Sequence, residues 1–128
     1  MTALLLVMGP PYESDLTTTL LRLVEAALGA GHRIVVWTCG GATALTQRTL
    51  GASKPRNPMR PADRHPSTSR LVAGLVNRSG GALRWYVCRQ CMDERGATAQ
   101  IAEVVVQPPF RFLPCLEEAD VCLSLGVK

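Results

Sequence analysis

The chain has 128 residues, a length that allows one domain with a single hydrophobic core. Hydrophobic residues make up 47% of it, which excludes a disordered chain, and no apolar run approaches the roughly 20 residues that span a bilayer. The net charge is +4, and an odd number of cysteines, five, argues against a secreted disulfide framework. We therefore expect a cytoplasmic globular domain with no membrane partner.

Two buried strands joined by a helix open the chain. Residues 3–8 form a continuous apolar run that ends at a Gly-Pro-Pro sequence, the pattern of a strand buried on both faces. Ser14 or Asp15 can cap a helix, and residues 16–28 carry an apolar stripe at helical spacing. Residues 34–37 form the second strand. Strand, helix and strand in this order predict a right-handed parallel unit.

The middle of the chain joins a basic, proline-rich segment to a helix and a third strand. Residues 51–66 carry four prolines among charged and small residues, so we expect a mobile excursion there. Ser67 or Thr68 then caps a helix with an apolar stripe. Residues 83–87 form the third strand.

The last third of the chain completes the sheet. Residues 91–99 turn helical, residues 104–106 form a short edge strand before two prolines, residues 114–119 form a short helix, and residues 121–125 form the final strand. Alternating strands and helices predict a single α/β domain over residues 1–128. Its sheet should be open and mainly parallel, with about five strands and helices on both faces.

The excess positive charge lies in one segment. Residues 48–70 contain six basic residues and one acidic residue, whereas the remainder is close to neutral. Such a segment could attract nucleic acid or an acidic partner protein, or be a solvated loop. No aromatic residues lie between these cations, so the segment offers no aromatic side chains on which bases could stack. Direct binding of nucleic acid is therefore disfavoured.

Cysteines gather where this fold places its sites. Proteins with open α/β sheets place their binding and catalytic sites beyond the carboxyl ends of the strands. The loops after the first three predicted strands contain Tyr12, Cys39, Cys88 and Cys91. Cys115, at the start of a helix that leads back into a strand, could lie at the same edge. Up to four sulfur atoms are therefore expected to converge.

Cys88 is the leading candidate for a reactive thiol. It ends a strand where a helix can begin, and a helix N-terminus and nearby cations lower the pKa of a thiol. Arg89 and Arg95 could supply these cations, although Asp93 and Glu94 partly offset them. We expect the Cys88 thiol to be exposed and acidic.

The Cys-x-x-Cys spacing of Cys88 and Cys91 leaves alternatives open. A zinc site needs four ligands, which Cys39 and Cys115 would have to complete from separate loops. A thioredoxin-like dithiol follows an early strand, whereas this pair follows the third. A non-catalytic metal- or partner-binding module that uses these four cysteines is therefore the alternative function. Cys122, inside the last strand, is expected to be a small buried hydrophobe.

Four stretches of the chain occur in an order that resembles one family. The first strand leads through Gly9-Pro10-Pro11-Tyr12 into a long helix, and residues 27–32 approach the second strand. The third strand ends in Cys88 with Arg95 and Gly96 following, and residues 116–120 lead to the last strand. Together these resemble the DsrE/DsrF/DsrH sulfur-relay family, which includes the TusBCD proteins of tRNA thiolation.

The resemblance implies a DsrE-like fold and a sulfurtransferase-like role. Cys88 would accept a sulfane sulfur as a persulfide and hand it to the next protein, with no cofactor or metal. Sulfur donor and acceptor proteins would be the partners, and the chain would form homo- or hetero-oligomers, commonly trimers or hexamers. Tyr12, Cys39, Arg89, Arg95 and Gly96 would border or support the site.

Cys91 departs from the family pattern, because the relay needs only the first cysteine. It could resolve the Cys88 persulfide by forming an internal disulfide, which would release sulfide. It could equally point into the core from the first helical turn. Both roles stay open at the level of the sequence.

Overall fold

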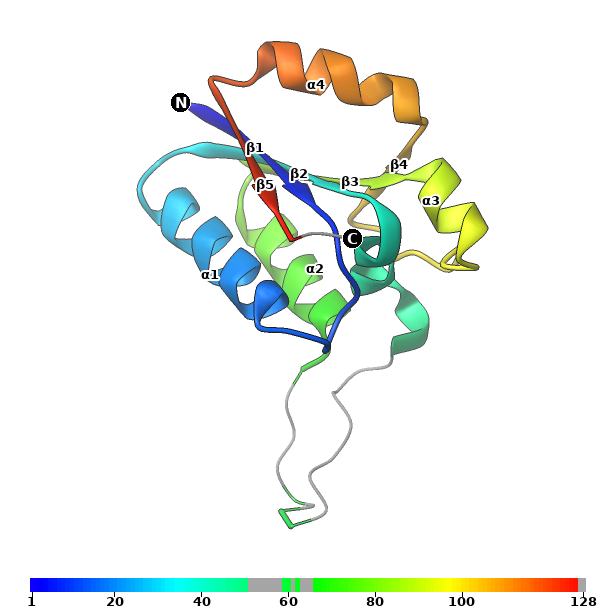
Figure 1. Cartoon of the computed structure of the whole chain (residues 1–128). Helices are drawn as coiled ribbons and strands as arrows, with labels where there is room; N and C mark the ends of the chain where they lie inside the picture. The colour runs from blue at the N-terminus through cyan, green and yellow to red at the C-terminus, as the bar shows by residue number, and fades with distance from the viewer. Residues whose placement is uncertain (51–58, 61, 63–65, 127–128) are drawn as a thin grey trace.

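Five parallel strands form one sheet with helices on both of its faces (Figure 1). The computed structural model describes residues 1–50, 59–60, 62 and 66–126, and every strand pairing within them is parallel. The order across the sheet is β4-β3-β2-β1-β5. The strands are β1 (Thr2–Val7), β2 (Arg33–Thr38), β3 (Leu83–Cys88), β4 (Val105–Gln107) and β5 (Val121–Leu125). The predicted fold class is confirmed, and β4 lies at an edge as expected.

The helices agree with the sequence pattern except around α3. They are α1 (Leu16–Gly29), α2 (Thr68–Arg78), α3 (Arg89–Glu94) and α4 (Phe112–Glu118), with 3-10 segments η1 (Gly40–Thr46), η2 (Arg48–Leu50) and η3 (Pro109–Arg111). Ser67 caps α2 as predicted, since its Oγ accepts a hydrogen bond from the backbone N–H of Arg70 at 3.4 Å. None of the described helices has the length and apolar character needed to cross a bilayer.

Helix α3 is shorter than the predicted residues 91–99 and begins earlier. It starts directly after Cys88, which is both the last residue of β3 and the N-cap of the helix. Gly96 ends it, because its φ of 65° lies in the left-handed region that glycine adopts without steric cost. The role of Gly96 is therefore to terminate α3.

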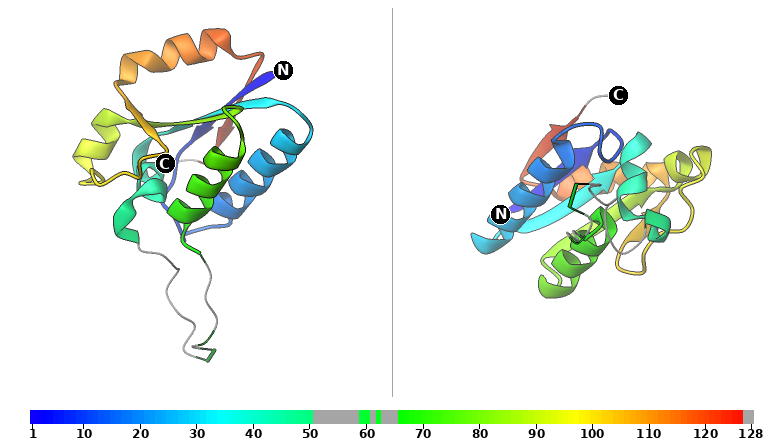
Figure 2. Two further views of the ribbon diagram at one scale, coloured as in Figure 1. Left: turned by 180° about the vertical axis from the view of Figure 1, so that it is seen from behind. Right: turned by 90° about the horizontal axis from the view of Figure 1, so that it is seen from below.

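The direction of the chain across the sheet decides which helices share a face. From β1 to β4 the chain advances in one direction, and it then returns to place β5 beside β1. Because parallel crossovers are right-handed, the forward connections lie on one face and the return connection on the other. Figures 1 and 2 show this arrangement, with α1 and α2 together on one side and α4 alone on the opposite side.

The two faces of the sheet are covered unequally. Between the sheet and the α1–α2 face lies the larger core, which includes Leu5, Val36, Trp85 and Val87. On the α4 face a smaller cluster of buried residues consists of Leu4, Trp37 and Cys88, with partly buried residues of α4 packed against it. The α4 face is thus the thin side of the molecule.

One prediction falls largely beyond what the structure describes. The mobile excursion was expected over residues 51–66, of which only residues 59–60, 62 and 66 belong to the described part of the chain. The excursion therefore stays a prediction, as does the role of the basic residues within it.

Candidate functional site

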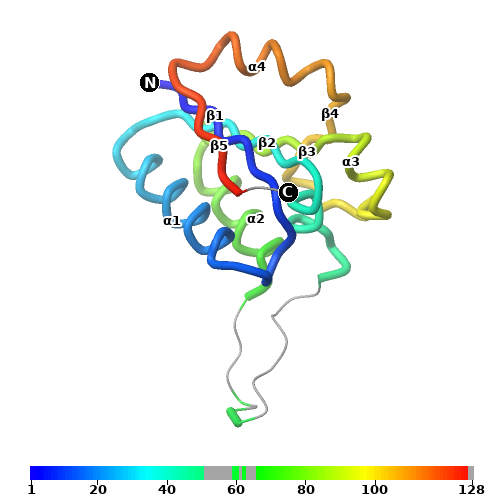
Figure 3. The backbone as a smooth tube through the Cα atoms, viewed as in Figure 1, coloured from blue at the N-terminus to red at the C-terminus, as the bar shows by residue number. Residues whose placement is uncertain are grey.

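The carboxyl ends of β1, β2 and β3 meet at one edge of the sheet. Thr38 of β2 pairs with Val87 of β3. The residues that follow them, Cys39 and Cys88, are therefore neighbours on the same face of the sheet. The backbone N–H of Cys39 donates to the carbonyl of Val7 at 2.9 Å, which fixes the loop after β2 against β1. Figure 3 follows the backbone from β2 into the 3-10 segment and from β3 into α3 on this side of the molecule.

Three cysteines form a cluster at this edge. The Sγ atoms of Cys39, Cys88 and Cys91 all lie within 4.8 Å of one another. All five cysteines of the chain are free thiols. The structure therefore brings together three of the four sulfurs that were expected to converge.

Cys115 does not belong to this cluster. Helix α4 carries the chain back toward the start of β5, so Cys115 lies half-buried on the thin face, with Glu118, Arg111 and Arg84 as its charged neighbours. Burial raises the pKa of its thiol, and the Glu118 carboxylate adds to this. A four-cysteine zinc site is thus not assembled among the described residues.

The expectation of an exposed, acidic Cys88 was wrong for this structure. Its side chain is only 3% exposed, packed with Leu4 and Trp37. Burial raises the pKa of the Cys88 thiol, an effect that the backbone N–H of Cys91 opposes without reversing it. The flanking arginines do not overcome the loss of solvation. At neutral pH Cys88 is held as a thiol.

Cys39 is also held as a thiol. Burial raises its pKa from 9.0 to about 12, and the neighbouring thiolates of Cys88 and Cys91 would raise it further. The indole N–H of Trp37 opposes this by donating to Cys39 Sγ at 3.2 Å. Trp37 is therefore part of the site as well as of the core.

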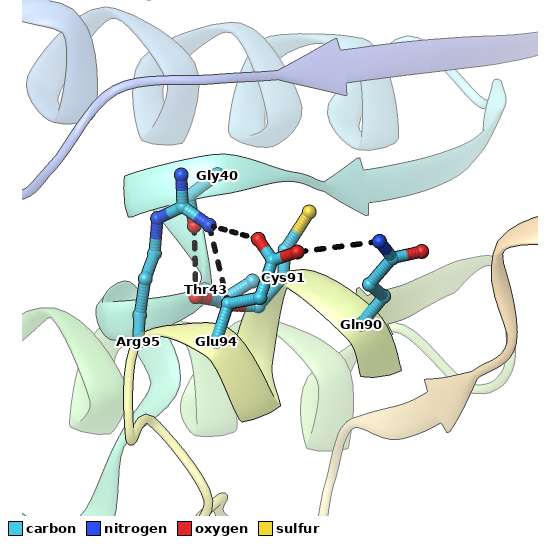
Figure 4. A network of polar contacts seen from close by, with 6 residues as sticks. All are labelled: Gly40, Thr43, Gln90, Cys91, Glu94 and Arg95. Carbon is cyan, nitrogen blue, oxygen red and sulfur yellow. Dashed lines mark hydrogen bonds and ion pairs between the residues drawn. The ribbon is translucent and has the colours of Figure 1, made fainter.

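Cys91 is the more accessible member of the Cys-x-x-Cys pair. It is half-buried in the first turn of α3, next to a polar network on the outer side of that helix (Figure 4). Arg95 donates to the carbonyl of Cys91 at 3.5 Å and to the carboxylate of Glu94 at 3.3 Å. Gln90 donates to the same carboxylate at 3.2 Å. The network holds the turn that carries Cys91.

Two pockets border the cluster. One, of about 500 Å³, is lined by Cys39 and Cys91 together with Arg95, Glu94 and the loop after β1. The other, of about 270 Å³, is lined by Cys39 and Cys88 under Phe112 and is almost entirely apolar. Cys39 lines both, so the three thiols lie between a pocket with charged residues and an apolar one.

The comparisons with known proteins agree with this fold. The model of the DsrE/DsrF-like family matches residues 1–112. The chain belongs to the DsrE/DsrF-like family. This membership points to sulfur relay as the general role of the chain, and it confirms the resemblance drawn from the sequence.

Solved structures show the same DsrE-like fold. The crystal structure of the YchN protein from E. coli covers 97% of this chain and 99% of its own, with a TM-score of 0.73 and 18% identity. A conserved protein of unknown function, BT1422 from Bacteroides thetaiotaomicron, covers 94% of this chain and 93% of its own, with a TM-score of 0.59 and 16% identity. At these identities the likeness concerns the fold alone. No match was found among the curated proteins.

Three of the predicted supporting residues of this DsrE-like chain, Tyr12, Arg89 and Gly96, line neither pocket of the thiol cluster. Tyr12 lines a groove between α1 and α2 with Leu21 and Leu71, and it does not line either pocket of the thiol cluster. Arg89, the first residue of α3, is exposed. Of the supporting residues, Cys39 and Arg95 are the ones that line a pocket of the cluster.

The sequence reasoning missed two residues that position the site. Trp37 was not predicted as a site residue, although its spacing of two from Cys39 places both side chains on one face. Gln100 donates to the carbonyls of Thr43 and Ala97, so it ties the loop after α3 to η1. Gln100 carries no local sequence signal, because its partners come from two distant segments.

The raised pKa of Cys39 predicts an alkaline loss of stability. Between about pH 9 and pH 12 the unfolded thiol ionises while the folded thiol keeps its proton, so the free energy of unfolding falls as the pH rises through this window. Below about pH 9 both states are protonated and Cys39 contributes no pH dependence. Urea unfolding of the reduced protein between about pH 8 and pH 10 measures this, and Cys39→Ser should show a shallower decline than the unmodified chain. Equal slopes would contradict the burial of this thiol.

Proposed function

We propose that this protein is a cytoplasmic sulfane-sulfur carrier. It holds sulfur as a persulfide on Cys88 and exchanges it with donor and acceptor proteins through Cys91. The observation that carries this proposal is the convergence of the Cys39, Cys88 and Cys91 sulfur atoms within 4.8 Å, with a pocket on either side. Membership of the DsrE/DsrF-like family supports the same general chemistry.

Sulfur is received by Cys91, because its thiol is the accessible one of the pair. The Cys91 thiolate attacks the outer sulfur of a donor persulfide. The S–S bond of the donor breaks, and its electron pair leaves on the donor thiolate. Cys91 then carries the –S–SH group, and the larger pocket with Arg95 gives the donor a path to it.

Transfer within the cluster moves the sulfur to Cys88. The Cys88 sulfur attacks the outer sulfur of the Cys91 persulfide as its proton passes to the departing Cys91 thiolate. The products are a Cys88 persulfide and a Cys91 thiol, with no net oxidation. The Cys88 sulfur is buried beside the apolar pocket, and this burial limits the access of water and small nucleophiles to the stored sulfur.

Cys91 has a second possible reaction with the stored sulfur. If its thiolate attacks the inner sulfur of the Cys88 persulfide, a Cys88–Cys91 disulfide forms and hydrosulfide leaves. That outcome makes the protein a sulfide-releasing variant that needs an external dithiol for each turnover. The two reactions differ in mass: relay adds one sulfur atom to the chain, whereas resolution removes two hydrogens.

Mass spectrometry of the loaded chain tests the assignment. Trypsin cleaves after Arg84, Arg89 and Arg95, so Cys88 lies in the peptide 85–89 and Cys91 in the peptide 90–95. After incubation with a persulfide donor and alkylation, we expect one additional sulfur in the peptide 85–89. In Cys88→Ser the additional sulfur should be absent from the peptide 85–89 and remain on Cys91 in the peptide 90–95, while Cys115→Ser and Cys122→Ser should load like the unmodified chain. Sulfur confined to the peptide 112–128 would overturn the proposal.

Partner proteins are part of this proposal. A carrier without a cofactor needs a donor that supplies a persulfide and an acceptor whose thiolate removes it. The large exposed side chains Val105, Phe110 and Leu113 lie at and after β4 and in α4, on and beside the thin side of the molecule. They fit the oligomer, trimeric or hexameric, that the family resemblance implies, and light scattering of the purified chain would measure it.

A further inference from the structure

The thiol cluster has the composition of a soft-metal site. Three sulfur atoms from three positions in the sequence lie within 4.8 Å of one another, and no histidine or carboxylate belongs to that group among the described residues. Thiolates select Cu(I), Zn(II) and iron–sulfur clusters over harder metal ions. We infer that Cys39, Cys88 and Cys91 together bind one Cu(I) ion per chain. This inference does not depend on sulfur relay by the same residues.

The spacing of the sulfurs is close to that of a trigonal site. A metal–thiolate bond is about 2.3 Å long, so three sulfurs around one ion stand about 4 Å apart. The observed separations, all within 4.8 Å, need only small side-chain rotations to reach this value. Cys39 follows β2 and Cys88 ends β3, so two of the three ligands are fixed by the parallel register.

The number of sulfurs favours Cu(I) over zinc. Zinc in structural sites takes four protein ligands, and Cys115, the sulfur that could have completed such a set, lies outside the cluster. Cu(I) is satisfied by three thiolates alone. Met8, a residue type whose sulfur soft ions accept, lines both pockets beside Cys39.

A hydrogen-bond donor already points at one of the sulfurs. The indole N–H of Trp37 donates to Cys39 Sγ at 3.2 Å, and Cys91 follows Cys88 in the first turn of α3, with Cys88 as the N-cap of that helix. Binding Cu⁺ to three thiols releases three protons and leaves a net charge of −2 on the complex. The Trp37 indole N–H and the guanidinium of Arg95 in the adjacent pocket stabilise that negative charge. Such outer partners orient metal ligands and strengthen binding.

Anaerobic competition against a chromophoric Cu(I) chelator tests the inference on the reduced full-length chain. We expect one Cu(I) per chain, and X-ray absorption should show sulfur donors alone at the metal. Cys39→Ser, Cys88→Ser and Cys91→Ser should each weaken binding by more than about 100-fold, beyond the cost of losing an outer partner. Trp37→Phe should weaken it by about 10-fold. Cys115→Ser and Cys122→Ser should bind as the unmodified chain does.

Several outcomes would overturn this assignment. An unchanged Cu(I) affinity in Cys39→Ser or Cys91→Ser would show that the cluster does not bind the metal. One copper shared by two chains and lost in Cys122→Ser would place it between molecules. Preferential binding of Zn(II) with four donors would replace Cu(I). Because Cys88 is buried, the fold of each variant is checked by circular dichroism. If Cys88→Ser is destabilised, the affinity of Cys91→Ser, whose thiol is only half-buried, decides the test.

Discussion

Replacing Cys91 with serine is expected to slow the loading of Cys88 by at least about tenfold. Cys88 is 3% exposed, and burial raises the pKa of its thiol above the ordinary value, so little of it is thiolate at pH 7. A donor protein would have to reach this thiol directly once Cys91 is gone. Persulfide exchange depends on thiolate fraction and on access, and both are poor at Cys88.

The measurement is the rate at which sulfur enters the peptide 85–89 after addition of a protein donor, with samples quenched by alkylation. Cys115→Ser is the matched control, because that thiol is also half-buried but lies outside the cluster. An unchanged rate in Cys91→Ser would mean that donors reach Cys88 without it. The proposed order of transfer would then be wrong, while storage on Cys88 would stand.

Gly126→Ala is expected to lower the free energy of unfolding by at least about 2 kcal/mol. Gly126 has a φ of 79°, a conformation that side chains with a Cβ disfavour. An added Cβ would lie 2.1 Å from the carbonyl oxygen of Met8 and 2.7 Å from Leu16 Cδ2. The backbone of Met8 cannot retreat easily, because its N–H donates to Leu125 at 3.0 Å.

Gly31→Ala separates the two causes. Gly31 has a similar φ of 84°, but an added Cβ there would meet nothing within 4 Å. Gly31→Ala should therefore lower the free energy of unfolding only by the conformational strain, roughly 1–2 kcal/mol. Urea unfolding of both variants measures the difference. Equal losses would show that the contact with Met8 does not matter.

Much of the fold could be predicted from the sequence because its signals are local. Continuous apolar runs predicted the central strands, and the serine before α2 predicted its N-cap. Strand ends that carry cysteines predicted where Cys39, Cys88 and Cys91 would meet, since parallel strands share one carboxyl edge. The end of α3 was predicted too late, although Gly96 is a local stop signal.

The environment of the thiols could not be predicted, because it depends on distant segments. Cys88 is buried by Trp37 and by residues of α4, which are remote in sequence. Cys122 was expected to be buried within an apolar strand, yet it is exposed, because β5 is an edge strand whose residues are covered only in part. Cys115 was misplaced because the sequence did not show that α4 runs back along the opposite face.

Among the described helices, α4 is the one that covers the thin face, and this affects how Cys88 can meet other molecules. A helix of seven residues has almost no stability of its own, so it stays in place through contacts such as Phe112 against Trp37, whose rings are 5.3 Å apart. Lifting such an element is a local opening that costs less than global unfolding. Amide exchange should therefore be faster in α4 than in α1 or α2. A partner that binds α4 and displaces it would uncover the Cys88 sulfur without disturbing the main core.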